Sequence, residues 1–479
     1  MSSRLRWFTV AGLCLAAAAC SGAGGRGTLP GQGGTGGAGG SSGGGSGGTG
    51  GSGASGGSSG APSCTLPSGV SATPSSFALP APRCGVQFTR AASPSSSLSY
   101  GLLDLASGNR QDLVVFHDAC DTDVGESRWD VYPASESGFA FKPASFALPA
   151  ARCNEPFKAA ARYTGSVSYQ TLRLVSPARP DLVVTRDTCD TTVGQSHWDV
   201  YPWSASGFAA TPVAFSVPAA RCNEPFDATA SSSGGTSYAT FALASSQPDL
   251  VVTRDTCDSS VGTTHWDVYR GSASGFPAAP HSFALPAARC NVKFDATAHT
   301  GDVDYALSDL TSKGHADLVV THDACDASVG ATHWDVYPWS ASGFPAAPHS
   351  FALPAARCGA AFDAMASESG GLGYAVVDLA SSGKPDLVVF RDDCDTSVGT
   401  THWDVYPGSP SGFASKPIPF AIPAARCNSA FDHSASSYGE LVYFTADLAS
   451  ACGPDLVVTS DACDTTVGQS HWDVYRPLK

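Results

Sequence analysis

The chain has 479 residues, with 27 lysines and arginines against 42 aspartates and glutamates, and a formal net charge of −15. No acidic residue and three arginines lie in residues 1–63, so the remaining 416 residues carry 24 basic and 42 acidic side chains, a net charge of −18. A basic stripe is the electrostatic footprint of a nucleic-acid binder, and this balance excludes that class. It also disfavours docking on anionic lipid head groups. A neutral sugar, a cationic ligand or a metal ion fits the charge better.

The first residues of the chain predict a secretory signal. Arg4 and Arg6 precede 13 apolar residues at 7–19, a run too short to span a bilayer. The ending "AAAC" resembles a bacterial lipobox, so we expect residues 1–19 to be a lipoprotein signal peptide and Cys20 to be lipidated. Acyl chains on Cys20 would hold the protein on a membrane, and Ser21 favours the outer membrane or cell surface. The alternative is an ordinary cleaved signal peptide.

A Gly/Ser-rich segment follows, so we expect residues 20–63 to be the lipidated cysteine and a disordered tether. Residues 64–479 are built from a repeat. The word "HWDVY" stands at 197–201, 265–269, 333–337, 402–406 and 471–475, and "RWDVY" stands at 128–132. Cysteines of the motif "DxCD" recur at steps of 69, 68, 68, 69 and 69 residues, and a second series, "RC", also has six copies. A word repeated at a fixed period indicates architecture.

Each unit predicts four short strands, which in one copy are "YALSDL" (305–310), "DLVVTHD" (317–323), "HWDVY" (333–337) and "SFALP" (350–354). Four-stranded units repeated around an axis are typical of a β-propeller. The ordered part begins with a fourth strand, "SSFALP", and ends with three strands that lack a fourth. We therefore expect an all-β, six-bladed propeller of units of about 69 residues, in which the N-terminal strand joins the C-terminal blade and closes the ring. Another closed or stacked β-repeat is the alternative.

The cysteines of the two series predict disulfides in an oxidising compartment. Because the second and fourth strands of a blade run the same way, we expect pairs within one blade: Cys120–Cys153, Cys189–Cys222, Cys257–Cys290, Cys325–Cys358, Cys394–Cys427 and Cys463–Cys84. The competing scheme joins each "RC" cysteine to the "DxCD" cysteine 35 or 36 residues further on and links neighbouring blades. Cys64 and Cys452 are left without a partner by either scheme, and sequence alone does not settle the connectivity.

Alternation along "HWDVY" places Trp334 and Val336 on one face, and His333, Asp335 and Tyr337 on the other. A tryptophan in every copy is interpreted as core between blades, and the His and Asp as hydrogen-bond partners of turns. The rival interpretation is a ring of ligand sites, for which His333 and His402 are candidates. Arg128 replaces the histidine in the first full copy.

The stretch "VVDLASSGKPDLVVFRD…WDVYPGSPSGF" (376–413) resembles FG-GAP/VCBS-type propeller repeats, and the resemblance runs through all six units. It implies an extracellular propeller that binds proteins or glycans and often holds calcium in an acidic turn before the "DLVV" strand. The turns here are degenerate. Asp309 with Asp317, and Asp378 with Asp386, keep the outer ligands, whereas uncharged residues or lysine replace the middle ones. Calcium takes six to eight oxygens, so it is a possible but not a certain cofactor, and ordinary hydrogen-bonded loops are the alternative.

Variation between the copies gives further candidates. The loop "PWSASGF" places Trp203 and Trp339 at turns, where they are a sugar platform or simple loop packing.

No nucleophile elbow, HExxH motif or singular pair of carboxylates is found, so no catalytic residues are assigned. The sequence therefore favours a membrane-anchored extracytoplasmic binding module for glycan or protein ligands, rather than an enzyme. The alternatives are a glycoside hydrolase or lyase of six-bladed type, or a structural envelope protein.

Overall fold

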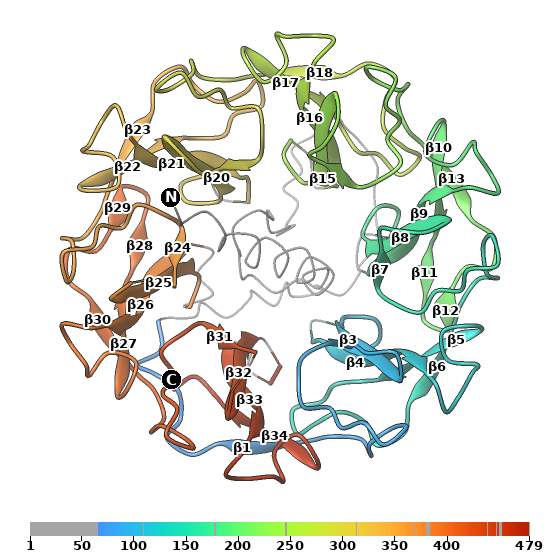
Figure 1. Ribbon diagram of the computed structural model, residues 1–479, viewed down its shortest axis with the longest axis horizontal. Coiled ribbons are helices and arrows are strands. Elements are labelled where there is room, and N and C mark those ends of the chain that lie inside the picture. The colour runs from blue at the N-terminus through green and yellow to red at the C-terminus, as the bar shows by residue number, and fades with distance from the viewer. Residues whose placement is uncertain are drawn as a thin grey trace, which may run out of the picture.

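The computed structural model describes residues 66–478 apart from positions 109, 177–178, 245–246, 313, 369, 380–383, 438, 447 and 450–452. The expected signal segment 1–19, Cys20, the tether up to residue 63, Cys64 and Cys452 lie outside the described residues. Within the described part of the chain, the strands form six sheets, which stand around a common axis (Figure 1). The expected all-β propeller fold is confirmed. Among the described residues, no helix has the length and apolarity needed to cross a bilayer.

We number the sheets along the chain and give their strands from the axis outwards. Sheet 1 contains β2 (Ser93–Pro94), β3 (Leu98–Leu103), β4 (Asp112–Asp118), β5 (Arg128–Tyr132) and β6 (Ala144–Ala147). Sheet 2 contains β7 (Ala161–Arg162), β8 (Val167–Leu172), β9 (Asp181–Asp187), β10 (His197–Tyr201) and β13 (Val213–Ser216). Sheet 3 contains β14 (Ala230–Ser231), β15 (Thr236–Phe241), β16 (Asp249–Asp255), β17 (His265–Tyr269) and β18 (His281–Ala284).

The second half of the ring repeats this order. Sheet 4 contains β19 (Ala298–His299), β20 (Val303–Ser308), β21 (Asp317–Asp323), β22 (His333–Tyr337) and β23 (His349–Ala352). Sheet 5 contains β24 (Ala366–Ser367), β25 (Leu372–Val377), β26 (Asp386–Asp392), β27 (His402–Tyr406) and β30 (Ile418–Ala421). Sheet 6 contains β31 (Ala435–Ser436), β32 (Leu441–Ala446), β33 (Asp455–Asp461), β34 (His471–Tyr475) and β1 (Ser75–Ala78). Two short hairpins join the outer strands of sheets 1 and 4: β11 (Trp203–Ser204) with β12 (Gly207–Phe208), and β28 (Gly408–Ser409) with β29 (Gly412–Phe413).

The cores lie between neighbouring sheets. Each "DLVV" strand is β-branched and buried on both of its faces, as expected for a strand covered on both sides. In sheet 4, Trp334 packs with residues of sheet 5, whereas Tyr337 packs with residues of sheet 3. The Trp334 Nε1 donates a hydrogen bond to the Phe362 carbonyl of the next sheet at 2.7 Å, and the same bond recurs at every seam. The tryptophan of "HWDVY" is therefore core between sheets, as predicted.

The N-terminal segment completes sheet 6. The strand β1 pairs antiparallel with β34, with Ser75 opposite Val474, which is the predicted joining of the two ends. Gly69 also lies against Ala421 of sheet 5, where a Cβ would come within 2.5 Å of the Ala421 carbonyl oxygen. Gly138, Gly207, Gly275, Gly343 and Gly412 make the same close approach to the outer strand of the preceding sheet. The glycine of "SGF" is required because two backbones meet there.

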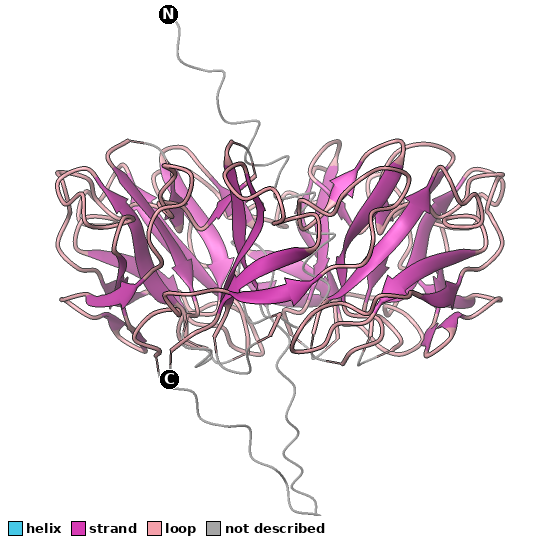
Figure 2. Ribbon diagram, turned by 90° about the horizontal axis from the view of Figure 1, so that it is seen from below, coloured by secondary structure: helices cyan, strands magenta, loops and turns pink. Residues whose placement is uncertain are grey.

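The ring has two distinct faces. Because the strands are antiparallel, the loops after the second strand and the crossovers to the next sheet share one face, which we call the disulfide face. The loops between the first and second strands, and between the third and fourth, share the opposite face, which we call the turn face. The chain leaves β34 on the turn face, and Figure 2 shows this end of the chain at the lower face.

Candidate functional site

The disulfides follow the competing scheme, and the favoured prediction of pairs within one blade was wrong. Each "RC" cysteine is bonded to the "DxCD" cysteine of the next unit: Cys84–Cys120, Cys153–Cys189, Cys222–Cys257, Cys290–Cys325, Cys358–Cys394 and Cys427–Cys463. The physical reason is the crossover. After its fourth strand the chain has already passed to the next sheet when it reaches "RC", so this cysteine lies beside the end of that sheet's second strand.

A tight turn presents each "RC" cysteine. Arg83 and Val86 exchange backbone hydrogen bonds of 3.1 and 2.7 Å, and the two residues between them, Cys84 and Gly85, have φ values of 48° and 72°. Two successive residues with positive φ are typical of a type I′ turn, for which Asn and Gly are favoured at the second central position. Every copy has Asn or Gly after the cysteine. That signal could have located the turn from the sequence.

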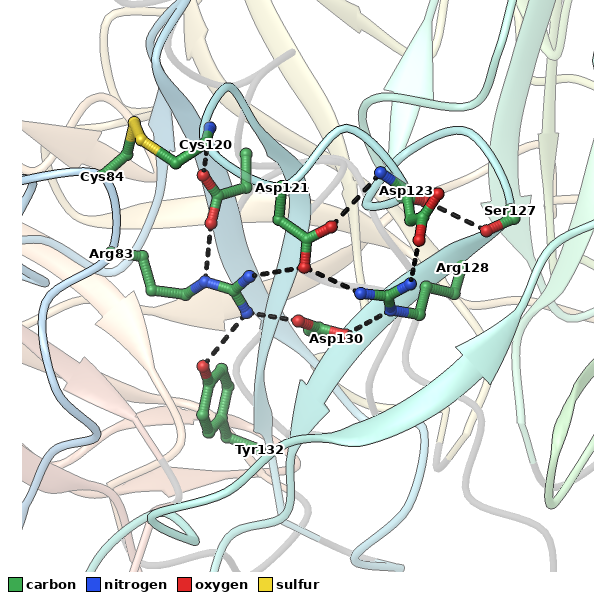
Figure 3. Close-up of polar contacts among 10 residues, drawn as sticks. Arg83, Cys84, Cys120, Asp121, Asp123, Ser127, Arg128, Asp130 and Tyr132 are labelled. Atoms are coloured by element: carbon green, nitrogen blue, oxygen red, sulfur yellow. Dashed lines mark hydrogen bonds and ion pairs between the residues drawn. A yellow bond between two sulfur atoms is a disulfide. The ribbon is translucent and has the colours of Figure 1, made fainter.

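The "RC" arginine is the centre of a buried polar network in every sheet. Figure 3 shows the copy in sheet 1, where Arg83 donates to Asp130 and to the hydroxyl of Tyr132. Its Nε also donates to the Oδ2 of Asp118 at 2.7 Å, and this distance is the same in the other sheets. Burial alone would lower the pKa of Arg83, but the hydrogen bonds to Asp130 and Tyr132 raise it. The arginine is therefore the fixed counter-ion of two buried carboxylates, Asp118 and Asp130, beside the disulfide.

The candidate ligand residues His333 and His402 lie on the disulfide face and are engaged within the repeat. The ring of His333 is half-buried, with Nδ1 3.0 Å from the Thr332 hydroxyl and Nε2 3.4 Å from an Asp335 oxygen. His402 has equivalent contacts with Thr401 and Asp404. These contacts support the interpretation of the histidines as partners of their own turn.

The first copy replaces this histidine with Arg128. The guanidinium of Arg128 contacts Asp121 at 2.7 Å and Asp123 at 3.1 Å (Figure 3). Asp123 has a serine or threonine at its position in the other five copies. Arg128 and Asp123 thus occur together in the first copy, where they form an ion pair on the disulfide face of sheet 1.

The candidate residues Trp203 and Trp339 lie on the turn face, away from the histidines, and both are half-buried. Trp203 packs against the core between sheets 1 and 2, and its Nε1 donates to the Leu105 carbonyl at 3.1 Å. Trp339 stacks on His315 with the ring centroids 3.7 Å apart. Loop packing therefore accounts for both rings, and the structure does not bring them together with His333 and His402.

The acidic turns also lie on the turn face. The Oδ2 of Asp317 accepts hydrogen bonds from the amides of Leu310, Thr311 and Ser312 at 3.2, 2.7 and 3.2 Å, and its Oδ1 accepts one from the Trp339 amide at 2.9 Å. Both oxygens of the buried carboxylate therefore already accept hydrogen bonds from backbone N–H groups, which would repel a cation placed among them. The turn at Asp317 therefore does not fit a calcium ion, whose ligands must direct oxygens at it.

Two of the other three candidate metal ligands accept backbone hydrogen bonds of the same kind. Asp309 accepts a hydrogen bond from the Gly314 amide at 2.6 Å, and Asp386 accepts one from the Gly408 amide at 3.0 Å. Asp378 is buried. Hydrogen-bonded loops account for the described part of these turns.

A polar depression at the seam of sheets 5 and 6 was not predicted. It has a volume of about 390 Å³ and is lined by Ser429, Asp432, His433, Ser436, Glu440 and Tyr443 among others. His433 Nδ1 lies 2.7 Å from Asp432 Oδ1, and its Nε2 lies 3.4 Å from Arg391. The hydrogen bond with Asp432 raises the pKa of His433, and the same bond lowers the pKa of Asp432.

One sequence signal could have drawn attention to this seam. At the position of His433, four of the other five copies have alanine: Ala159, Ala228, Ala296 and Ala364. The first copy has Arg90 there. A histidine that replaces the usual alanine marks a place where the repeat has been changed.

No family model matches this chain, and no curated protein matches it. Three solved structures are similar to this chain at low identity. A lectin of Agrocybe aegerita that recognises non-reducing terminal N-acetylglucosamine is 14% identical, with 80% of this chain and 81% of that chain covered and a TM-score of 0.38. The Dos1 propeller is 10% identical over 79% and 68% of the two chains, with a TM-score of 0.23. A putative gluconolactonase is 10% identical over 84% and 99%, with a TM-score of 0.25. Likenesses this weak say nothing about the function of this chain.

Proposed function

We propose that this protein is an extracytoplasmic binding module for glycan or protein ligands, in which a rigid ring presents recognition residues on its disulfide face. The proposal counts the six sheets as six blades of a closed propeller. It places the ring outside the cytoplasm, anchored through Cys20 to the outer membrane or cell surface. The six disulfides support only the place outside the cytoplasm, because disulfides persist in oxidising compartments; the membrane anchor rests on the sequence around Cys20.

The proposal rests on a comparison of the six copies of the repeat, which separates the residues that are the same in every copy from those that differ. Trp334 and Arg289, which recur in every copy, belong to the framework: Trp334 is buried between sheets, and Arg289 is hydrogen-bonded to buried Asp323. Charged residues that differ between copies meet at the seams of the disulfide face. Arg186 lies 3.8 Å from Asp227 between sheets 2 and 3, and Arg391 contacts His433 between sheets 5 and 6. Variable side chains on a rigid scaffold are the usual arrangement of a binding surface.

Binding is favoured over turnover because the repeated polar groups are saturated by structural contacts. The histidines, arginines and aspartates of the networks all have partners within the repeat. A catalytic acid or base needs a free position toward its substrate. The alternatives are a glycoside hydrolase or lyase, and a structural protein of the envelope.

A glycan array probed with the mature, oxidised protein tests the proposal, with product analysis of each bound glycan. We expect retention of a related group of glycans without any cleavage. Cleavage of a bound glycan would refute the binding module and favour the glycoside hydrolase or lyase. Absence of glycan binding, together with absence of a partner in cross-linking on intact cells, would leave only the structural role.

A further inference from the structure

In sheets 2 and 3, a glutamate side chain of the same sheet lies between the "RC" turn and the inner hairpin, which consists of the two innermost strands. In sheet 3, the Gly235 amide donates to Glu224 Oε1 at 2.6 Å, and the Thr236 amide donates to Oε2 at 2.9 Å. In sheet 2, the Ser166 amide donates to Glu155 Oε1 at 2.9 Å, and Arg162 forms an ion pair with Oε2 at 2.8 Å. The successive amides of the inner hairpin are thus a carboxylate-binding site, which these sheets fill from within.

Sheet 6 has the same backbone without the glutamate. Ser429 stands at the position of Glu155 and Glu224, and the turn that presents it has the same hydrogen bonds, with 2.7 Å from the Ser429 amide to the Arg426 carbonyl. Gly439 has a φ of 101°, close to the 103° of Gly165 in sheet 2.

The register of the inner hairpin is also the same. Ser436 pairs with Tyr443 as Ser231 pairs with Tyr238 in sheet 3. In this register, Glu440 and Leu441 take the places of Gly235 and Thr236. Their amides therefore correspond to the pair that holds Glu224.

The space that the glutamate would fill is the polar depression at the seam of sheets 5 and 6. Its volume of about 390 Å³ lies within the range of about 300–1,000 Å³ that is typical of small-molecule sites. The side chains of Ser429, Ser436 and Asn428 line it with hydroxyl and amide groups, and Tyr443 adds an aromatic ring. A sugar ring matches this lining, because it offers hydroxyl groups to the polar side chains and an apolar face to the tyrosine.

The charges around the depression are mixed. Asp432 is paired with His433, and Arg391 lies next to His433. Arg391 also donates to the carbonyl oxygens of Glu368 and Gly370. The side chain of Glu440 is exposed at the rim. The net negative charge of the rest of the chain is largely screened beyond about 8 Å at physiological salt, so the local donors decide what binds.

We infer that the depression of sheet 6 binds the carboxylate of an acidic sugar unit, in the place that Glu155 and Glu224 fill in sheets 2 and 3. The inference rests on the proposed binding function and names the ligand class for one site. It goes beyond the neutral sugar that the overall charge favours, because the internal glutamates show what the hairpin amides accept.

Calorimetric titration of the mature, oxidised protein with D-galacturonate tests the inference, with D-galactose as the neutral probe. We expect galacturonate to bind at least about tenfold more tightly than galactose, because a charge-assisted pair of hydrogen bonds is lost with the neutral sugar. Ser429→Glu supplies the internal carboxylate and should abolish galacturonate binding. Ala424→Glu adds the same charge at an exposed position outside the depression, and it should bind as the parent does.

Ser429→Gln gives a second variant that fills the space without a charge, and we expect it to lose galacturonate as well. Equal affinity for the two sugars would overturn the inference, and so would unchanged galacturonate binding by either folded variant. Failure of the site and failure of the proposed function are distinguishable. Retention of array glycans by Ser429→Glu would refute only this site, whereas a parent protein that retains no glycan and cross-links to no partner on intact cells would refute the function.

Discussion

Replacing one network arginine, Arg221, by methionine should destabilise the ring strongly. Arg221 Nε donates to Asp255 at 2.7 Å, and the guanidinium also contacts Asp267 and Tyr269. The side chains of Asp255 and Asp267 are only 3% and 9% exposed. Removing the partner of a buried charge costs roughly 3–5 kcal/mol. Because the Arg221 side chain is 16% exposed to solvent, we expect the lower end of this range, a loss of about 3 kcal/mol of unfolding free energy.

Equilibrium unfolding in urea, with the disulfides intact, measures this change. Arg270→Met is the matched control, because Arg270 is an exposed arginine that directly follows Tyr269 of the same network, and it should cost no more than about 0.5 kcal/mol. Adding Asp255→Asn and Asp267→Asn to Arg221→Met should recover part of the loss, since the uncompensated charges are removed. A loss for Arg221→Met no greater than that of Arg270→Met would refute the role of the arginine as a structural counter-ion.

Three further predictions concern the framework. Peptide mapping without reduction should recover Cys153 linked to Cys189; a peptide that links Cys120 to Cys153 would contradict the connectivity found here. Gly412→Ala should cost about 2 kcal/mol more than Gly359→Ala, measured by urea unfolding. Both glycines have positive φ, but only at Gly412 would a Cβ lie 2.5 Å from a backbone oxygen; equal losses would argue against the close approach. Millimolar calcium or a chelator should leave the melting temperature unchanged, whereas Asp317→Ala should cost at least about 2 kcal/mol because several amides lose their acceptor. Stabilisation by calcium that Asp317→Ala removes would show that the acidic turn does hold the ion.

The repeat made much of the fold predictable. Two of the expected strands, 317–323 and 333–337, coincide with β21 and β22, because their β-branched and aromatic residues are buried on both faces. The offset of the repeat predicted that β1 would join β34. The disulfide connectivity was harder to predict, since chain loops of 33 residues and of 35 or 36 residues cost nearly the same entropy to close. The deciding fact is that the crossover carries Cys153 over the next sheet, and that depends on tertiary structure.

The candidate site was much less predictable. Trp203 and Trp339 were chosen because aromatic rings in loops suggest a sugar platform, but their rings pack against neighbouring turns. The depression of sheet 6 arises where Ser429 stands in place of the longer glutamate of sheets 2 and 3. Only the hydrogen bonds of Glu224 in sheet 3 show what Ser429 leaves open in sheet 6. A comparison of copies along the sequence shows the substitution, but it does not show which backbone amides the glutamate satisfies.

The central claim is that the ring is a binding module, and the inference for sheet 6 assigns an acidic glycan to its disulfide face. A glycan array probed in parallel with the mature, oxidised parent and with Ser429→Glu tests it most directly. We predict that the parent retains glycans with terminal acidic sugars, leaves them uncleaved, and loses them in the variant. A parent protein that retains no glycan, or that cleaves those it meets, would contradict the account.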